Sequence, residues 1–205
     1  MSPQSRWTLQ DREAALRADM AYYFSQGGLL KDMKVGYDAN DPKNEFTRTG
    51  MSAMLTRSPV TGTYYLAFRG TESLLNGPDV KADFMQGVGL PAEQYRMAIQ
   101  LARRVKQELG SEARIVLAGH SLGGGLAAAA SYATGLNATL FNPASVNRIY
   151  SRGNSGSIRS HVVEGDFLSL GRTVVGRAAP GEIIVHPAKT IVPFMQHLMF
   201  NFPDY

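Results

Sequence analysis

The sequence lacks cysteine, which excludes two kinds of chemistry at once. None of its 205 residues is a cysteine, so the chain holds no disulfide framework and no cysteine nucleophile. It also lacks a run of 18 apolar residues, and its polar N-terminus, MSPQSRWTLQDRE, shows no signal-peptide pattern. We therefore expect no membrane-spanning helix, and a protein that either stays in the cytoplasm or is exported by a dedicated secretion system.

Strong charge is also missing. The net charge is +4 and the basic residues are scattered rather than gathered in a stripe, which is too weak a pattern to indicate a nucleic-acid partner. The mild excess of positive charge does suit attraction to anionic surfaces such as phospholipid headgroups. At this length the sequence predicts one domain over residues 1–205, with residues 1–28 forming an N-terminal helix packed on it.

What the sequence does contain is a strand, a sharp turn and a helix around one serine. Residues 113–130 read ARIVLAGHSLGGGLAAAA, and the Gly-x-Ser-x-Gly spacing at the turn is typical of a nucleophile elbow. Gly119 and Gly123 remove Cβ atoms that would clash across so tight a turn. Ser121 is therefore the candidate nucleophile, while His120 is expected to pack within the elbow. The N-terminus of the following helix would stabilise an oxyanion.

The rest of the chain alternates strands and helices around this elbow. A first helix over residues 8–25 has Thr8 as N-cap with Asp11 three residues on, and an apolar face near Leu16, Met20, Tyr23 and Phe24. A hairpin of strands 50–57 and 63–68 follows, then a helix over 91–109. Further strands are expected at 137–141, 157–163 and 181–186, before a helical or irregular segment at 191–202.

This order of elements predicts the fold class. Strands that alternate with helices form a mostly parallel sheet with helices on both faces. The hairpin adds an antiparallel N-terminal edge. The pattern is that of a small α/β-hydrolase, and its long helix should bury a stripe comprising Tyr95, Ala98, Leu101, Ala102, Val105 and Leu109.

A serine nucleophile needs an acid to orient its base, and four acids follow Ser121. They are Glu164, Asp166, Glu182 and Asp204. In this fold the partners follow in the order serine, acid, histidine, each at a strand end. Asp166 comes after an apolar strand, in a Gly-Asp turn, and is the preferred candidate; its alternative role is that of an ordinary turn aspartate.

Three histidines after the serine compete for the role of base. His161 precedes the acid and lies inside a strand, which indicates a core residue. His186 ends a strand and remains a competitor. His197 is the last histidine of the chain and lies in an apolar run, where a structural role is common. The order of the triad nevertheless favours His197.

An oxyanion hole needs two donors. The backbone N–H of Leu122, the residue after the nucleophile, is one candidate. Thr71, directly after the apolar strand TYYLAF and Arg69-Gly70, can supply the other through its backbone or its hydroxyl. The irregular segment 72–90 carries Leu74, Leu75, Phe84 and Met85, which either form a lid that contacts lipid or simply pack on the sheet.

Taken together, these motifs resemble a known family. Residues 67–71 (AFRGT), residues 119–124 (GHSLGG), Gly165-Asp166 and His197-Leu198 are similar to the class 3 lipases, the fungal-lipase-like α/β-hydrolases, over roughly residues 50–202. The resemblance implies a Ser121, Asp166 and His197 triad, an oxyanion hole at Thr71 and Leu122, and a lid within 72–90. The chain departs from the family in being short, in lacking a tryptophan in that loop and in lacking a V-H-x-G-F stretch before residue 91.

The resemblance implies a serine hydrolase that cleaves carboxylic esters of lipids, most simply a lipase or phospholipase A in peripheral contact with a membrane. Neither cofactor nor metal is expected. Two alternatives use the same chemistry: a soluble carboxylesterase, and a bacterial effector or toxin lipase neutralised by an immunity protein. A catalytically inactive binding module is a third alternative, against which the complete serine, acid and histidine order argues.

Overall fold

The fold is built on one six-stranded sheet, in the part of the chain that the computed structural model describes: residues 7–23, 49–70, 92–146, 149–166, 179–190 and 198–203. The strands lie in sequence order across the sheet. They are β1 (Ala53–Arg57), β2 (Tyr64–Phe68), β3 (Ile115–His120), β4 (Asn137–Phe141), β5 (Ile158–Val163) and β6 (Glu182–His186). Only β1 and β2 pair antiparallel, and all other neighbours are parallel. The predicted mostly parallel sheet with an antiparallel hairpin is confirmed.

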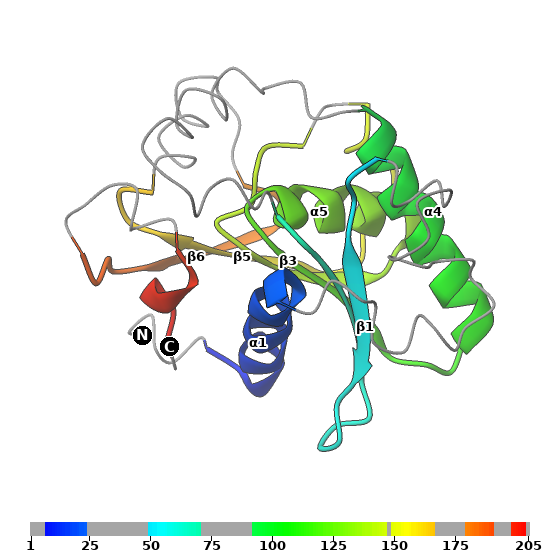
Figure 1. The fold of residues 1–205 in the computed structure, drawn as a ribbon, viewed down its shortest axis with the longest axis horizontal. Helices are drawn as coiled ribbons and strands as arrows, with labels where there is room; N and C mark the ends of the chain where they lie inside the picture. The colour runs from blue at the N-terminus through cyan, green and yellow to red at the C-terminus, as the bar shows by residue number, and fades with distance from the viewer. Residues whose placement is uncertain are drawn as a thin grey trace.

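Two helices cover one face of this sheet, called the α4/α5 face below (Figure 1). They are α4 (Ala92–Leu109) and α5 (Leu122–Thr134). The stripe predicted on α4 is buried as far as Val105, and Leu109 at the helix end is half-buried. It meets the alanines of α5 and the side chains that β2 and β3 point to this side, including Leu66, Phe68 and Leu117. Apolar packing therefore holds this face.

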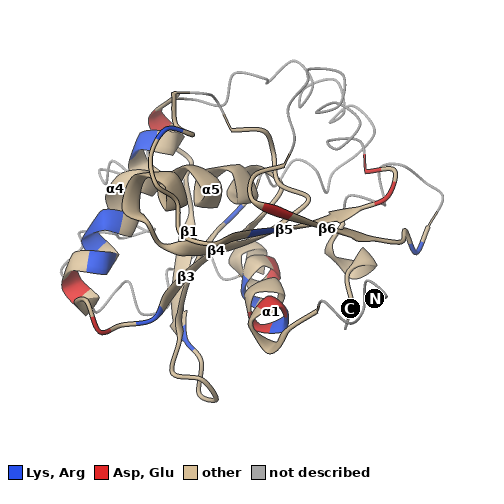
Figure 2. Ribbon diagram, turned by 180° about the vertical axis from the view of Figure 1, so that it is seen from behind, with Lys and Arg blue, Asp and Glu red and all other residues tan. Residues whose placement is uncertain are grey.

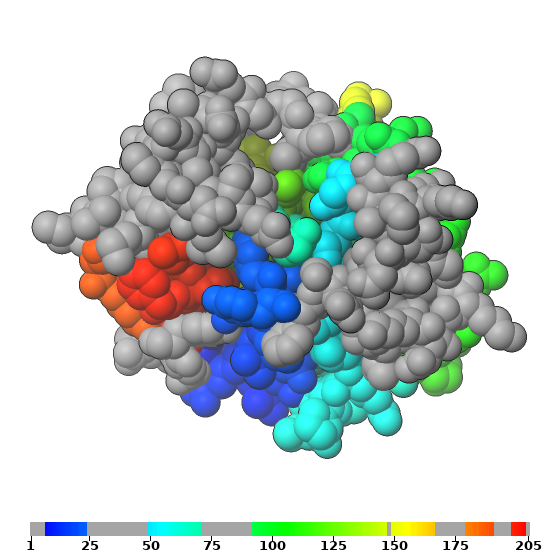
Figure 3. Space-filling view, viewed as in Figure 1, coloured from blue at the N-terminus to red at the C-terminus, as the bar shows by residue number. Residues whose placement is uncertain are grey.

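Helix α1 (Leu9–Tyr23) covers the opposite face, called the α1 face, together with the short 3-10 helix η4 (Met199–Asn201) (Figure 1). Its start is the capping box expected from the sequence. The Asp11 amide donates to Thr8 Oγ1 at 3.2 Å, and the Thr8 amide donates to Asp11 Oδ2 at 2.8 Å. In the space-filling view, α1 lies between the red C-terminal residues and the cyan hairpin, below a hollow (Figure 3).

The apolar face predicted for this helix is wrong. Leu16 is 50% exposed and Tyr23 is 72% exposed, while Phe24 lies outside the described residues. The buried stripe consists of Ala14, Ala15, Ala18 and Ala21. Small side chains let the helix backbone approach the sheet closely, so the large apolar residues lie on its flanks and outer side.

Charged residues are spread along α4 (Figure 2). The helix has two acidic residues and four basic ones, and all four basic residues are exposed. The basic residues are Arg96, Arg103, Arg104 and Lys106. Among the described residues, no helix is long and apolar enough to cross a membrane.

Candidate active site

The centre of the candidate site is the turn between β3 and α5, where Ser121 has a strained backbone. Its φ of 56° and ψ of −123° lie in a region that residues with a side chain rarely adopt. Hydrogen bonds on both sides hold this conformation. The Ser121 amide donates to the Phe141 carbonyl at 3.0 Å, and the Ser121 carbonyl accepts from Ala144 at 2.8 Å. Such strain persists only where the surroundings enforce it, and it is common at active sites.

The glycines around this serine are required by close backbone contacts. A Cβ on Gly119 would lie 2.3 Å from the carbonyl carbon of Gly123. A Cβ on Gly123 would lie 2.1 Å from the Phe68 oxygen at the end of β2. Any side chain at either position would push the elbow away from its helix or from the neighbouring strand. The spacing of the motif thus follows from the packing of β2, β3 and α5.

The hydroxyl of Ser121 lies at the start of α5. Its side chain is fully buried, and Oγ makes no hydrogen bond among the described residues. The first backbone N–H groups of a helix are free of intrahelical partners and carry a partial positive charge. Leu122 supplies the first of them. When Ser121 attacks a carbonyl carbon, the carbonyl oxygen would therefore develop its negative charge beside this helix end.

Asp166 lies at the carboxyl end of β5, two strands from the serine. It is fully buried and follows Gly165, whose φ of 75° makes the turn. Its amide donates to the Val163 carbonyl at 3.2 Å. A buried carboxylate is retained only where other groups compensate its charge. Asp166 is thus a buried residue at the carboxyl-terminal edge of the sheet, the same edge at which Ser121 lies.

One residue that sequence reasoning did not single out links the ends of β4 and β5. Asn142 follows β4 with a φ of 39°. Its side-chain oxygen accepts from the Val163 amide at 2.9 Å, and its own amide donates to the His161 carbonyl at 2.8 Å. Because β4 lies between β3 and β5, Asn142 lies between the Ser121 turn and the Asp166 turn. The only signal in the sequence was Asn142-Pro143 directly after a strand.

The structure carries two of the three candidate histidines away from the serine. His186 Nε2 lies 2.8 Å from His161 Nδ1, and both rings pack edge-on against Trp7 on the α1 face. β6 is three strands from β3, about 14 Å at the usual strand spacing. The structure therefore does not bring His186, the competitor for the base, to Ser121. His161 is the core residue that the sequence indicated.

These two histidines belong to a buried polar cluster that the sequence did not reveal. His161 Nε2 lies 3.2 Å from Asp11 Oδ1, and Arg159 donates to both Asp11 oxygens at 3.0 and 2.9 Å. Burial alone raises the pKa of Asp11, but the hydrogen bonds from His161 and Arg159 outweigh it and hold that pKa well below its ordinary value. Burial and the neighbouring His161 lower the pKa of His186 to about 4.

The remaining predicted site residues lie outside the described part of the chain. They are Thr71, Leu74, Leu75, Phe84, Met85 and His197. The second oxyanion donor, the base and the lid therefore stay predictions. Within the described residues, no group of three or more His, Cys, Asp or Glu side chains could hold a metal ion.

His120, beside the nucleophile, turns away from the serine towards α1. It is 4% exposed, and its Nδ1 lies 2.9 Å from the hydroxyl of Tyr22. It packs in the elbow, as the sequence indicated. The tyrosine that holds it was not foreseen, because nothing in the sequence distinguishes Tyr22 from Tyr23.

Comparison with known proteins identifies the family. An extracellular phospholipase A1 of Serratia liquefaciens is 43% identical over 84 residues, which are 41% of this chain and 25% of that protein, so the match spans a quarter of its length. The triacylglyceride lipase of Rhizomucor miehei superposes with a TM-score of 0.51 at 17% identity, over 91% of this chain and 83% of that one. It shares the fold. The family model of the Tle-like phospholipase domain matches residues 34–184. The chain therefore belongs to the Tle-like phospholipase domain family.

Proposed function

We propose that this chain is a serine hydrolase that cleaves the acyl esters of phospholipids, with neutral glycerides as the second substrate class. The observation that carries the proposal is the strained Ser121 between β3 and α5, whose Oγ makes no hydrogen bond among the described residues and lies beside the first N–H groups of the helix. The family supports the substrate class. Because the Serratia relative is a phospholipase A1, the sn-1 ester is the first bond to test.

The proposed reaction proceeds through an acyl-enzyme. Ser121 Oγ attacks the ester carbonyl carbon while His197 takes the hydroxyl proton, and Asp166 orients the imidazole. The Leu122 N–H and Thr71 stabilise the oxyanion. As the carbon–oxygen bond to the leaving alcohol breaks, His197 returns the proton to it. Water then attacks the acyl-enzyme while His197 takes its proton. His197 passes this proton to Ser121 Oγ as the bond to the acyl group breaks, which releases the fatty acid and restores the free serine.

Contact with a lipid surface is part of the proposal. The four exposed basic residues of α4 and the net charge of +4 suit an anionic bilayer. Leu74, Leu75, Phe84 and Met85, although outside the described residues, are the proposed apolar contact. Leu74→Ser with Leu75→Ser should reduce hydrolysis of liposomes far more than that of a soluble p-nitrophenyl ester. Val60→Ser is the control, because Val60 is 75% exposed at the hairpin turn, at the other end of the strands. Equal losses on both substrates would favour a plain soluble carboxylesterase.

Export and inhibition are proposed together. The Serratia relative is extracellular, and we propose that this domain also acts outside the cell that makes it. An immunity partner that blocks the site stays a prediction. Coexpression with candidate inhibitors from the same genome, read out as loss of esterase activity, tests it.

The decisive experiment compares Ser121→Ala with wild-type protein on liposomes of phosphatidylethanolamine and phosphatidylglycerol. Released fatty acids and lysophospholipids are identified by mass spectrometry. We expect the variant to lose at least a thousandfold in rate, while Ser155→Ala, a change at an exposed serine, leaves hydrolysis unchanged. Retention of more than a few per cent of the wild-type rate by Ser121→Ala would exclude this serine as the nucleophile.

A further inference from the structure

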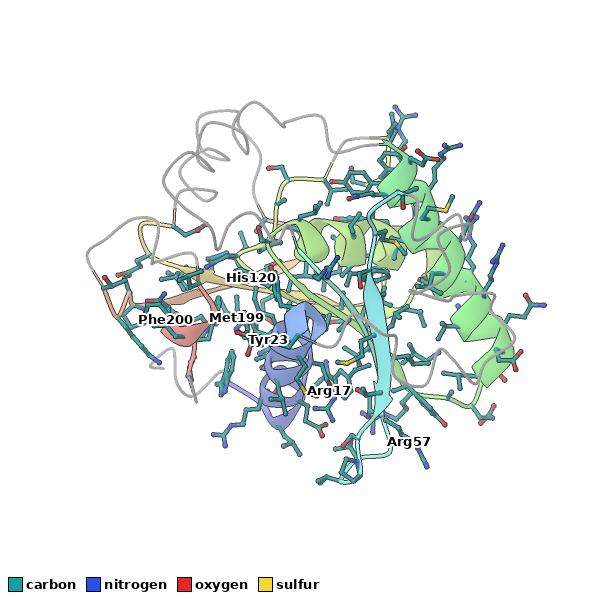
Figure 4. All side chains as sticks on the ribbon, viewed as in Figure 1. Arg17, Tyr23, Arg57, His120, Met199 and Phe200 are labelled. Carbon is teal, nitrogen blue, oxygen red and sulfur yellow. The ribbon has the colours of Figure 1, made fainter. Side chains whose placement is uncertain are left out.

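Tyr22, in the last turn of α1, lies directly against the nucleophile turn. Its hydroxyl is 2.9 Å from Nδ1 of His120, and the two ring centres are 5.9 Å apart. The end of α1 lies beside the labelled His120 (Figure 4). The next residue, Tyr23, is 72% exposed. Of two consecutive tyrosines, one therefore faces the elbow and the other faces solvent.

The same hydroxyl also contacts the end of β2. A Cβ on Gly70 would lie 2.2 Å from the Tyr22 oxygen and 2.9 Å from the His120 carbonyl oxygen. The backbone of Gly70 also makes a hydrogen bond to the Tyr22 oxygen. Gly70 is the residue before Thr71. A single phenol oxygen thus bridges the chain just after β2 and the last residue of β3.

The Tyr22 phenol can bond both partners at once. Burial, strengthened by the nearby Asp19, raises the pKa of Tyr22, so the phenol keeps its proton. A phenol has one proton to donate and two lone pairs to accept with. It accepts from the Gly70 N–H, and it keeps a proton and a second lone pair for the bond to Nδ1 of His120.

We propose that Tyr22 is a positioning residue that holds the nucleophile turn, and with it the Leu122 N–H, against the chain just after β2. The Leu122 N–H, a proposed oxyanion donor, lies two residues after His120. Hydrogen bonds that join Tyr22 to both His120 and Gly70 therefore restrain this donor relative to β2. Oxyanion donors act only within a few tenths of an ångström of their working position. The inference rests on the proposed function, because it assigns Tyr22 a part in that same reaction.

The test pairs Tyr22→Phe with Tyr23→Phe, since each removes one hydroxyl from adjacent positions. On soluble p-nitrophenyl butyrate, Tyr22→Phe should lower kcat about tenfold with little change in KM, because the donors act on the transition state. Tyr23→Phe should match the wild type. A phenylboronic acid adduct of Ser121 places an oxygen in the oxyanion hole, so its affinity should fall by the same factor.

A merely structural tyrosine would give a different result. It would lower the thermal unfolding midpoint and leave kcat and boronate affinity of the folded fraction unchanged, which would overturn the inference and leave the proposed function intact. If the wild type neither hydrolyses esters nor reacts with a fluorophosphonate at Ser121, both fail together.

Discussion

On the α4/α5 face of the sheet the buried side chains are almost all apolar, whereas on the α1 face Asp11, His161 and His186 are buried among aromatic rings and alanines. Both faces belong to the same six-stranded sheet. The first is stabilised by the area removed from water, and the second also depends on a set of hydrogen bonds whose members must all be present. The α4/α5 face should therefore tolerate acid, and the α1 face should not.

The difference also separates structural histidines from the proposed catalytic one. On the α1 face His186 bonds His161, and His161 also contacts Asp11, which leaves His197 as the base in our proposal. The following predictions test this division, starting from the largest effect.

His197→Ala and Asp166→Asn should each lower kcat by about 10³ or more on a soluble ester, because the serine loses its base or the orientation of that base. His186→Phe should leave kcat of the folded protein within about twofold of wild type. Steady-state kinetics at 25 °C, corrected for folded fraction by circular dichroism, measures both. If His186→Phe is the inactive variant, the division of the histidines is wrong.

Asp11→Asn should destabilise the protein by about 3 kcal/mol, because it leaves Arg159 and His161 without their shared carboxylate. Leu101→Ala on the other face should cost a similar amount through a cavity. Urea unfolding measures the two losses.

Of these two losses of stability, only the one caused by Asp11→Asn should depend on pH. The pKa of Asp11 is lowered in the folded state, so its stabilisation is present above pH 4 and disappears as the pH falls towards the folded value. A loss for Asp11→Asn that is the same at pH 3 and pH 7 would contradict this.

Acidification should destabilise the wild type through His186. Its pKa falls from 6.5 to about 4 on folding, so between these values the unfolded chain binds more protons than the folded one. Stability is then complete above pH 6.5 and declines as the pH falls to 4, by up to about 3 kcal/mol. Urea titrations of wild type and His186→Phe between pH 7.5 and 4 measure the slope, which should be smaller in the variant. Parallel slopes would remove His186 as the cause.

Glu13→Gln should have the smallest effect, about 1 kcal/mol. The Glu13 carboxylate of α1 accepts hydrogen bonds from Ser58, Thr61 and Tyr65 of the hairpin. An amide keeps an acceptor oxygen, but loses the charge that strengthens these bonds. Glu108→Gln on the surface of α4 is the control and should change stability by less than about 0.5 kcal/mol. Equal effects from the two substitutions would show that the hairpin contacts contribute nothing.

Much of the fold could be predicted because its signals are local. The strand, turn and helix around Ser121 follow from an apolar run, a glycine spacing and an alanine-rich run, and the structure has β3 and α5 at these residues. The capping box of Thr8 and Asp11 spans three residues. The buried stripe of α4 is visible in the sequence because apolar residues recur every three or four positions along the helix. In each case the residues that interact are neighbours in the chain.

The α1 face could not be predicted in the same way. Helix α1 buries its alanines and exposes large apolar residues such as Leu16 and Tyr23. A search for a stripe of large apolar residues therefore selects the wrong face. The polar cluster joins residues far apart in the chain, because Asp11 and Arg159 are 148 positions apart. No spacing in the sequence marks such a pair.

The sequence by itself determined the order of strands and helices, the elbow serine and the candidate acid, since each depends on short patterns of backbone geometry and burial. Only the tertiary structure decided which histidines are structural, that Asn142 joins two strand ends, and that Tyr22 rather than Tyr23 meets the elbow. These choices depend on which side chains the sheet brings together from distant segments. That proximity is a property of the packed chain, because local sequence sets the elements and packing sets their neighbours.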